Sequence, residues 1–137
     1  MRDYDRLIVE AAYVCWEAGD LGGLLAHFDD EVEFAVNARG SPTILGTGCG
    51  RTLFASRVLT FLDKLEVVDY QAGYVTPREG CFTCPIRYHY RHKRSGMEID
   101  GTMRHVWHVR EGKVLRFEVV HDAERMGAFF ELTATVV

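Results

Sequence analysis

Three consecutive stretches in the second half of the chain alternate between apolar and polar residues, which is the period of a β-strand with one buried face. They cover residues 81–93, 97–110 and 113–121, and short glycine-containing turns separate them. Links this short leave no room for crossovers, so the strands are expected to pair as an antiparallel meander. A further strand is expected at 66–77. The second half of the chain is therefore constrained to form an amphipathic sheet.

The first half of the chain has the 3.6-residue period of amphipathic helices. Gly19 ends the first of them, and Asp20 is a good N-cap for the next. Residues 38–50 are rich in glycine and predict a loop. Helices are expected at 3–18, 20–28 and 51–64, a strand at 31–37, and a helical turn followed by a short strand within 123–137. Helices followed by a meander predict an α+β fold.

The composition sets the class of protein. A length of 137 residues with 47% hydrophobic and 26% charged residues predicts one globular domain, 1–137. The net charge of -4 argues against a nucleic-acid partner, and no run of about 20 apolar residues predicts a membrane span. The N-terminus lacks the pattern of a signal peptide, so we expect a cytoplasmic protein with its four cysteines reduced.

Two histidines fall on the apolar faces of the predicted strands. Residues two apart in a strand lie on the same face, and we call this odd or even position the parity of a residue. His105 has the parity of Met103 and Trp107, and His121 has that of Val119. A three-residue turn with Gly112 in the left-handed conformation would keep these faces matched. It would pair Val109 with Leu115, Trp107 with Phe117, His105 with Val119 and Met103 with His121. The histidines would then be diagonal neighbours on the inner face, either as core histidines or as the lining of a pocket.

Several short motifs resemble, in order and spacing, those of SnoaL-like proteins of the nuclear transport factor 2-like superfamily. The resemblance covers VCWEAGDL at 14–21, LLAHFDDEVEF at 24–34, Gly50-Arg51, WHVREGKV at 107–114 and His121-Asp122. It implies a cone-shaped fold, in which a bent antiparallel sheet wraps the N-terminal helices around an internal apolar pocket. It also implies a homodimer, often formed through the outer face of the sheet.

The resemblance does not fix the activity, because this fold carries many functions. Ketosteroid isomerases have a carboxylate base where this chain has Val36, and a second acid where it has His105. Asp100 and Arg104 have outward parity, which argues against the Asp-Arg-Asp arrangement of limonene-epoxide hydrolases. Histidine-based dehydratases and SnoaL-like cyclases are more similar. The candidate catalytic residues are His105, His121 and Asp122, and the candidate pocket residues are Tyr13, Trp16, Phe34, Val36, Tyr88, Tyr90, Met103, Trp107, Phe117 and Val119.

Two functions fit these residues. One is an enzyme acting on a small hydrophobic carbonyl compound as an isomerase, cyclase or dehydratase, with His121 as acid/base, His105 assisting, and a tyrosine donating to the developing enolate. Asp122 would orient a histidine or, since its parity is outward, cap the following turn. The alternative is a non-catalytic ligand-binding or dimeric assembly module. No cofactor or metal is expected, because the Cys81/Cys84, His89/His92 and His105/His108 pairs fall on opposite faces of strands.

Overall fold

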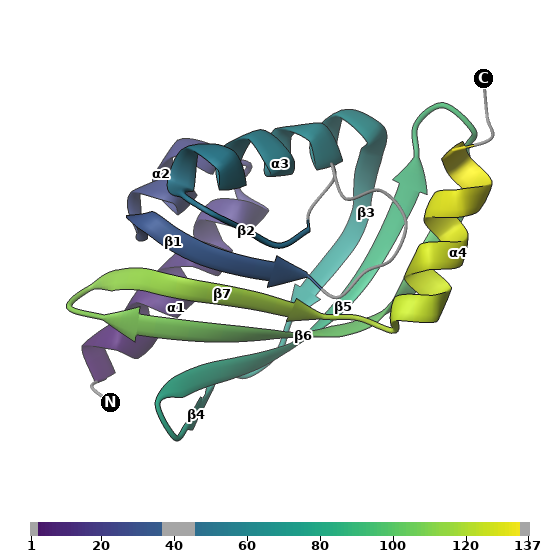
Figure 1. Cartoon of the computed structure of the whole chain (residues 1–137). Helices are drawn as coiled ribbons and strands as arrows, with labels where there is room; N and C mark the ends of the chain where they lie inside the picture. Colours follow the sequence, from purple (N-terminus) through teal and green to yellow (C-terminus); the bar gives the residue numbers. More distant parts are fainter. Residues whose placement is uncertain (1–2, 37–45, 135–137) are drawn as a thin grey trace.

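The computed structural model describes residues 3–36 and 46–134, which form helices packed against one curved sheet (Figure 1). The helices are α1 (Asp3–Glu17), α2 (Leu21–Ala26), α3 (Arg51–Lys64) and α4 (Ala123–Ala134). The strands are β1 (Phe28–Val36), β2 (Gly48–Cys49), β3 (Leu65–Ala72), β4 (Thr76–Arg78), β5 (Cys81–His92), β6 (Glu98–Arg110) and β7 (Lys113–Val120). The α+β class predicted from the sequence is confirmed.

The sheet is mixed rather than purely antiparallel. Its strand order is β2-β1-β7-β6-β5-β3, with β4 paired to β5. The meander β3-β5-β6-β7 is antiparallel as predicted, but β1 pairs with β7 in parallel. The short links that dictate antiparallel pairing exist only within the meander, because β1 and β7 are separated by most of the chain. Within the described residues the sheet is open: β2 forms one edge, and β3 and β4, which pair with different parts of β5, form the other.

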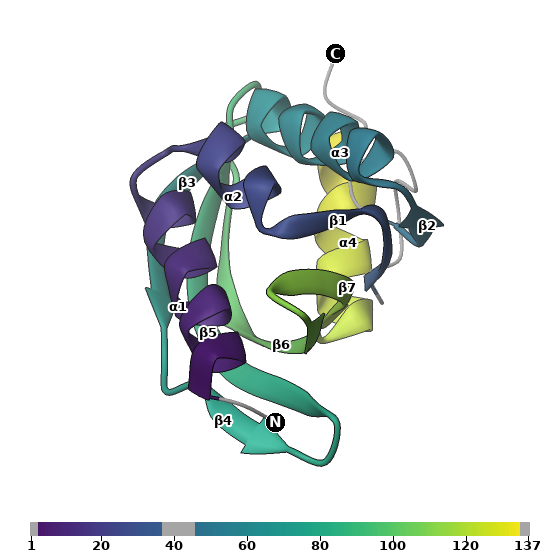
Figure 2. The same ribbon diagram turned by 90° about the vertical axis from the view of Figure 1, so that its left-hand side faces the viewer.

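Helices fill the concave side of this sheet. Figure 2 shows α1, α2 and α3 arranged along the inside of the curve, while α4 covers one end. Helix α3 contacts both β1 and β3 and so bridges the two sides of the open sheet. Asp20 caps α2 as predicted, since its Oδ1 accepts a hydrogen bond from the backbone N–H of Gly23 at 2.9 Å. None of the described helices combines the length and the apolar character that crossing a membrane requires.

The turn between β6 and β7 differs from the expected one. Arg110 pairs with Lys113, and only Glu111 and Gly112 lie between them. Both residues have positive φ angles, 52° and 78°, as in a type I′ turn. The predicted three-residue turn is therefore wrong. The twist of a two-residue type I′ turn matches that of the flanking strands, which favours this turn. It forms here even though it places residues of opposite faces across from each other next to the turn.

A β-bulge beside this turn restores the match between the two faces. Val109 pairs with Val114 rather than with Leu115, which is the extra residue in β7. Val114 is buried and Leu115 is only half-buried, the reverse of the expected order. Beyond the bulge the register is the predicted one: Trp107 pairs with Phe117 and His105 with Val119. The expected pair of Met103 with His121 lies past the end of β7.

Three other elements differ from the sequence prediction. The strand expected at 66–77 is divided into β3 and β4, which both pair with β5. The expected loop 38–50 lies mostly outside the described residues, and its described part contains β2. The C-terminal segment forms α4 over 12 residues instead of one turn, because Met126, Phe129 and Thr133 give it a continuous buried face.

Candidate functional site

A cavity of about 100 Å³ lies inside the curve of the sheet. Residues from all four helices and from β1, β3, β5, β6 and β7 line it. Among the described lining residues none is Asp, Glu, Lys or Arg, so the polar atoms come from histidine, tyrosine and tryptophan side chains. The lining residues are Ala12, Tyr13, Trp16, Leu24, Phe28, Val36, Gly46, Phe54, Phe61, Tyr70, Tyr90, Met103, His105, Trp107, Phe117, Val119, His121, Met126 and Phe130.

Strand alternation brings the two histidines to this cavity. In β6 the side chains of Met103, His105 and Trp107 all face inward and are buried. His121 comes just after β7, two residues beyond the buried Val119, and lines the same cavity. The positive form of His121 would disfavour protonation of His105, so the two rings are electrostatically coupled. The structure therefore brings together the two histidines that parity selected.

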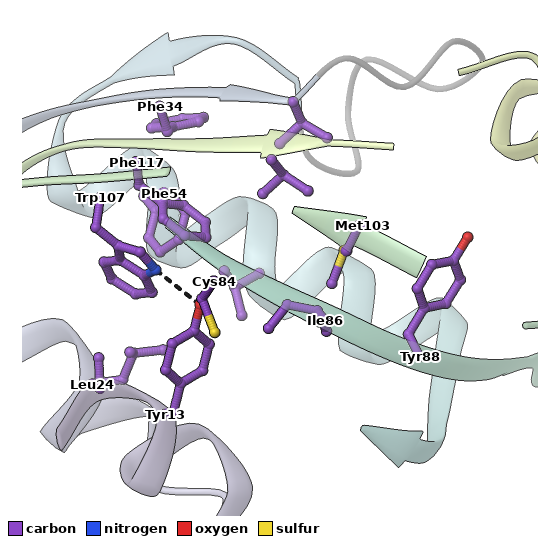
Figure 3. Packing of buried hydrophobic residues seen from close by; sticks show 14 of the residues in the cluster. Tyr13, Leu24, Phe34, Phe54, Cys84, Ile86, Tyr88, Met103, Trp107 and Phe117 are labelled. Atoms are coloured by element: carbon purple, nitrogen blue, oxygen red, sulfur yellow. Dashed lines mark hydrogen bonds between the residues drawn. The ribbon is translucent and has the colours of Figure 1, made fainter. Parts of the chain in front are cut away.

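His105 belongs to a hydrogen-bonded chain of three aromatic side chains. The hydroxyl of Tyr13 lies 2.7 Å from His105 Nδ1, and Trp107 Nε1 donates to the same hydroxyl at 2.9 Å. Figure 3 shows the bond between Trp107 and Tyr13 beneath the sheet. Burial, and secondarily His121, lowers the pKa of His105 to about 3, and burial raises the pKa of Tyr13. Both groups are therefore neutral near pH 7.

His121 occupies a less enclosed position than His105. Its ring is half-buried and stands edge-on to the ring of Tyr88, with centroids 5.8 Å apart. Burial lowers the pKa of His121 to about 4, because the apolar surroundings disfavour the charged imidazolium. Near pH 7 this ring is also neutral and can accept a proton.

Most of the predicted pocket residues line the cavity, but Phe34 and Tyr88 do not. The ring of Phe34 packs against Phe54 of α3, with centroids 5.2 Å apart, and covers Gly48 of β2. The hydroxyl of Tyr88 lies over Gly101 in the neighbouring strand. These two side chains have inward parity and are buried, but parity does not distinguish a core position from a cavity wall.

Sequence reasoning missed several cavity residues. Tyr70 lines the cavity because a register shift between Val67 and Asp69 changes the parity of β3. Burial raises its pKa well above the usual value, so it is a hydrogen-bond donor near pH 7. Met126 and Phe130 of α4 also line the cavity. Their spacing of four residues after a possible N-cap was a signal for this helix. The other missed lining residues are Ala12, Leu24, Phe28, Gly46, Phe54 and Phe61.

Asp122 takes the capping geometry rather than a place in the cavity wall. Its side chain is exposed, and its Oδ1 accepts a hydrogen bond from the backbone N–H of Arg125 at 3.2 Å. Asp100 and Arg104 are exposed on the outer face, where Asp100 pairs with Arg125 at 3.2 Å. In the described part of the chain, the cavity therefore offers imidazole and phenol groups for acid/base chemistry and no carboxylate.

No group of three or more His, Cys, Asp or Glu side chains in residues 3–36 and 46–134 is arranged to hold a metal ion. Cys84 is fully buried, whereas Cys81 is half-buried on the other side of β5. His89 Nε2 lies 2.6 Å from Glu98, and His92 Nδ1 lies 2.8 Å from the hydroxyl of Ser95. The described histidine pairs of β5 and β6 thus serve separate local contacts.

The arrangement of the elements matches many solved structures. An NTF2-like protein from Burkholderia xenovorans superposes with a TM-score of 0.80 at 18% identity, over 94% of this chain and 96% of that one. The chain adopts the NTF2-like fold. A protein from Mesorhizobium loti, proposed to be a SnoaL-like polyketide cyclase, gives a TM-score of 0.72 at 13% identity over 85% of this chain and 97% of its own.

A third structure with the NTF2-like fold is TerC, crystallised with polyporic acid. It gives a TM-score of 0.74 at 17% identity, over 96% of this chain and 99% of that one. No family model and no curated protein matches the sequence. These likenesses establish the fold, while the chemistry has to be argued from the cavity itself.

Proposed function

We propose that the protein binds a small, mostly apolar carbonyl compound in the cavity and that His121, assisted by His105, acts on it as an acid/base group. The observation that carries this proposal is the meeting of two imidazoles in a cavity whose described walls are otherwise aromatic and aliphatic. An apolar wall binds the body of such a ligand, and a few polar groups orient its oxygen.

The volume of the cavity limits the size of the ligand. An engineered cavity of about 150 Å³ takes benzene. A volume of about 100 Å³ within the described walls therefore corresponds to about one small ring. We infer that the reacting part of the ligand is a single ring or a short chain, and cyclopentanone is a suitable first probe.

The chemistry would begin with proton abstraction next to the carbonyl, a first step that isomerisation and aldol-type cyclisation share. Neutral His121 takes a proton from the adjacent carbon, the C–H bonding pair forms the C=C bond of an enolate, and the carbonyl oxygen takes the negative charge. His105 and the hydroxyls of Tyr70 or Tyr90 would stabilise that oxygen. Return of the proton from His121 to carbon regenerates a ketone, so no other reactant is consumed.

A second candidate is ligand binding without turnover. It is favoured by the low pKa values of about 3 for His105 and about 4 for His121, which make both imidazoles weak bases. Neutral imidazoles remain effective hydrogen-bond partners for a ligand oxygen. TerC, which has the same fold, was crystallised with polyporic acid, in line with small-molecule binding by this type of chain.

Deuterium exchange tests the proposal and separates the two candidates. Cyclopentanone is incubated with the protein in D₂O, and proton NMR follows the loss of the signals next to the carbonyl. We expect the wild-type protein to accelerate the exchange relative to buffer alone. In the His121→Gln variant we expect this acceleration to be about 100-fold smaller. His108→Gln is the matched control, because His108 lies on the outer face of β6 near Glu118.

The outcomes have distinct meanings. Binding of cyclopentanone without accelerated exchange would support the non-catalytic candidate and exclude the acid/base role for this ligand. If equal acceleration persisted in His121→Gln, another group would be the base. If cyclopentanone and acetophenone both failed to shift the NMR signals of Trp107 and Phe117, the cavity would not be a binding site for ketones.

A further inference from the structure

We propose that Tyr13, held by Trp107, fixes the proton of His105 on Nε2, so that His105 presents a hydrogen-bond donor to the cavity and selects ligands with an acceptor oxygen. This inference rests on the proposed binding function and assigns the polarity of the site. It gives the two histidines different roles, with His105 as the donor to the carbonyl oxygen and His121 as the base.

The assignment follows from counting donors and acceptors. The indole N–H of Trp107 can only donate, so the oxygen of Tyr13 accepts that bond at 2.9 Å. The hydroxyl proton of Tyr13 is then available to His105 Nδ1, 2.7 Å away. The planes of the Tyr13 and His105 rings are parallel to within 1°, with centroids 5.7 Å apart. A neutral imidazole that accepts at Nδ1 carries its proton on Nε2.

Cys84 offers the competing arrangement. Its thiol contacts the Tyr13 hydroxyl, and a hydroxyl proton directed to that sulfur would leave Nδ1 of His105 to donate. Sulfur is a weak acceptor, whereas the imidazole nitrogen is a strong one. The Cys84 thiol also has carbonyl acceptors of its own, at Gly73 and Pro85, at 3.5 and 3.7 Å. The arrangement with Tyr13 donating to His105 therefore gives every group a better partner.

The consequence concerns the ligand. Tyr13 is the one hydrogen-bond partner that the described chain gives to the His105 ring, and it takes Nδ1. The remaining polar ring atom, Nε2, is left for the cavity that His105 lines. A neutral imidazole with a donor at this position polarises a carbonyl without transferring a charge. Ketones and related acceptors match this polarity, and His121, which lines the same cavity, would act on the adjacent carbon.

NMR of the ligand-free wild-type protein tests the assignment directly. A long-range nitrogen–proton correlation spectrum at pH 7 reports which ring nitrogen of His105 carries the proton. We expect a proton on Nε2 in the wild type and in Cys84→Ala. In Tyr13→Phe, which lacks the hydroxyl donor, we expect a mixture of the two tautomers in place of one. Tyr70→Phe is the matched control, since it removes another cavity hydroxyl and should leave the His105 pattern unchanged. A proton on Nδ1 in the wild type, or a switch of tautomer in Cys84→Ala, would overturn the proposal.

Ligand binding tests the polarity. Cyclopentanone and methylenecyclopentane have the same shape, but only the first has an acceptor oxygen. Relative to the hydrocarbon, we expect cyclopentanone to bind about tenfold more weakly in His105→Leu than in the wild type. In His105→Gln, whose amide N–H stands in for Nε2, much of the affinity should return. An unchanged ratio in His105→Leu would contradict the donor role. Failure of both compounds to bind would count against the proposed function, while the ligand-free spectrum still decides the tautomer.

Discussion

Tyr13 in α1 and His105 in β6 are 92 positions apart in the sequence, yet the hydroxyl oxygen of one lies 2.7 Å from Nδ1 of the other. This bond joins the first helix to the middle of the sheet. It satisfies one ring nitrogen of a histidine that is 5% exposed, and it therefore holds a neutral imidazole in the core. Protonation of His105 would break this arrangement, since Nδ1 would then no longer accept.

The buried His105 should make stability depend on pH. Its pKa falls from the ordinary 6.5 to about 3 on folding, because burial disfavours the imidazolium. Between these values the unfolded chain binds a proton that the folded chain does not, so stability is complete above about pH 6.5 and is lost as the pH falls toward 3. We expect His105 to account for a loss of roughly 2 kcal/mol between pH 7 and pH 5, measured by urea unfolding.

His105→Gln provides the control for this prediction. Glutamine has no titrating group, so the variant should lose less stability than the wild type over the same interval, while all other groups titrate alike. His121 contributes with the same sign, since burial lowers its pKa to about 4. Parallel pH profiles for the wild type and His105→Gln would show that His105 does not titrate in this way.

Any turnover that depends on His121 should have an unusual pH profile. The base form of a histidine with a pKa of about 4 is almost fully populated at pH 5.5 and at pH 7.5. The rate of deuterium exchange per bound ketone should therefore stay flat over this range. An ordinary histidine with a pKa near 6.5 would lose about tenfold in rate between pH 7.5 and 5.5. A tenfold fall in the measured rate would contradict the low pKa of the catalytic group.

Strand parity predicted the centre of the site because it acts through fixed geometry. Once β6 is a strand, Met103, His105 and Trp107 must share a face, and the sequence shows which face is apolar. The register of His105 with Val119 also followed, although the turn was wrong, because the bulge at Leu115 compensates for the two-residue turn. Local sequence rules thus determine the faces, and here a bulge rather than the turn brings the faces of the two strands into register.

The remaining walls depend on packing that no local rule specifies. Tyr70 faces the cavity only because a register shift in β3 reverses its parity, and such a shift has no marker in the residues themselves. Met126 and Phe130 reach the cavity because α4 covers the end of the sheet, a contact between distant segments. The hydrogen bond between Tyr13 and His105 has the same origin, since it requires the angle at which α1 crosses the sheet.

Asp122 should behave as a helix cap and not as a catalytic group. The Asp122→Ala variant loses the bond to the N–H of Arg125, so it should be about 1 kcal/mol less stable by thermal or urea unfolding. Asp122→Asn keeps an acceptor at that position and should retain nearly all of the stability. Both variants should bind cyclopentanone as the wild type does. A large loss of exchange activity in Asp122→Asn, at unchanged stability, would instead place the carboxylate in the site.

The turn that sets the β6–β7 register contains a residue in an unfavourable conformation. Glu111 has a φ of 52°, the only positive φ of a non-glycine residue in the described chain. Most residues other than glycine are disfavoured there. Asn tolerates this region better than most, and it is the preferred partner of glycine in type I′ turns. We expect Glu111→Asn to raise the free energy of unfolding by about 0.5–1 kcal/mol.

Glu79→Asn is the matched control for this substitution. Glu79 also precedes a glycine with a φ of 78° in a turn, but its own φ is not positive. The same chemical change at position 79 should therefore leave stability within about 0.5 kcal/mol of the wild type. Urea unfolding of the two variants under identical conditions gives the comparison. An equal gain at both positions would attribute the effect to the removed negative charge, and a loss at position 111 would exclude relief of the left-handed conformation as a source of stability.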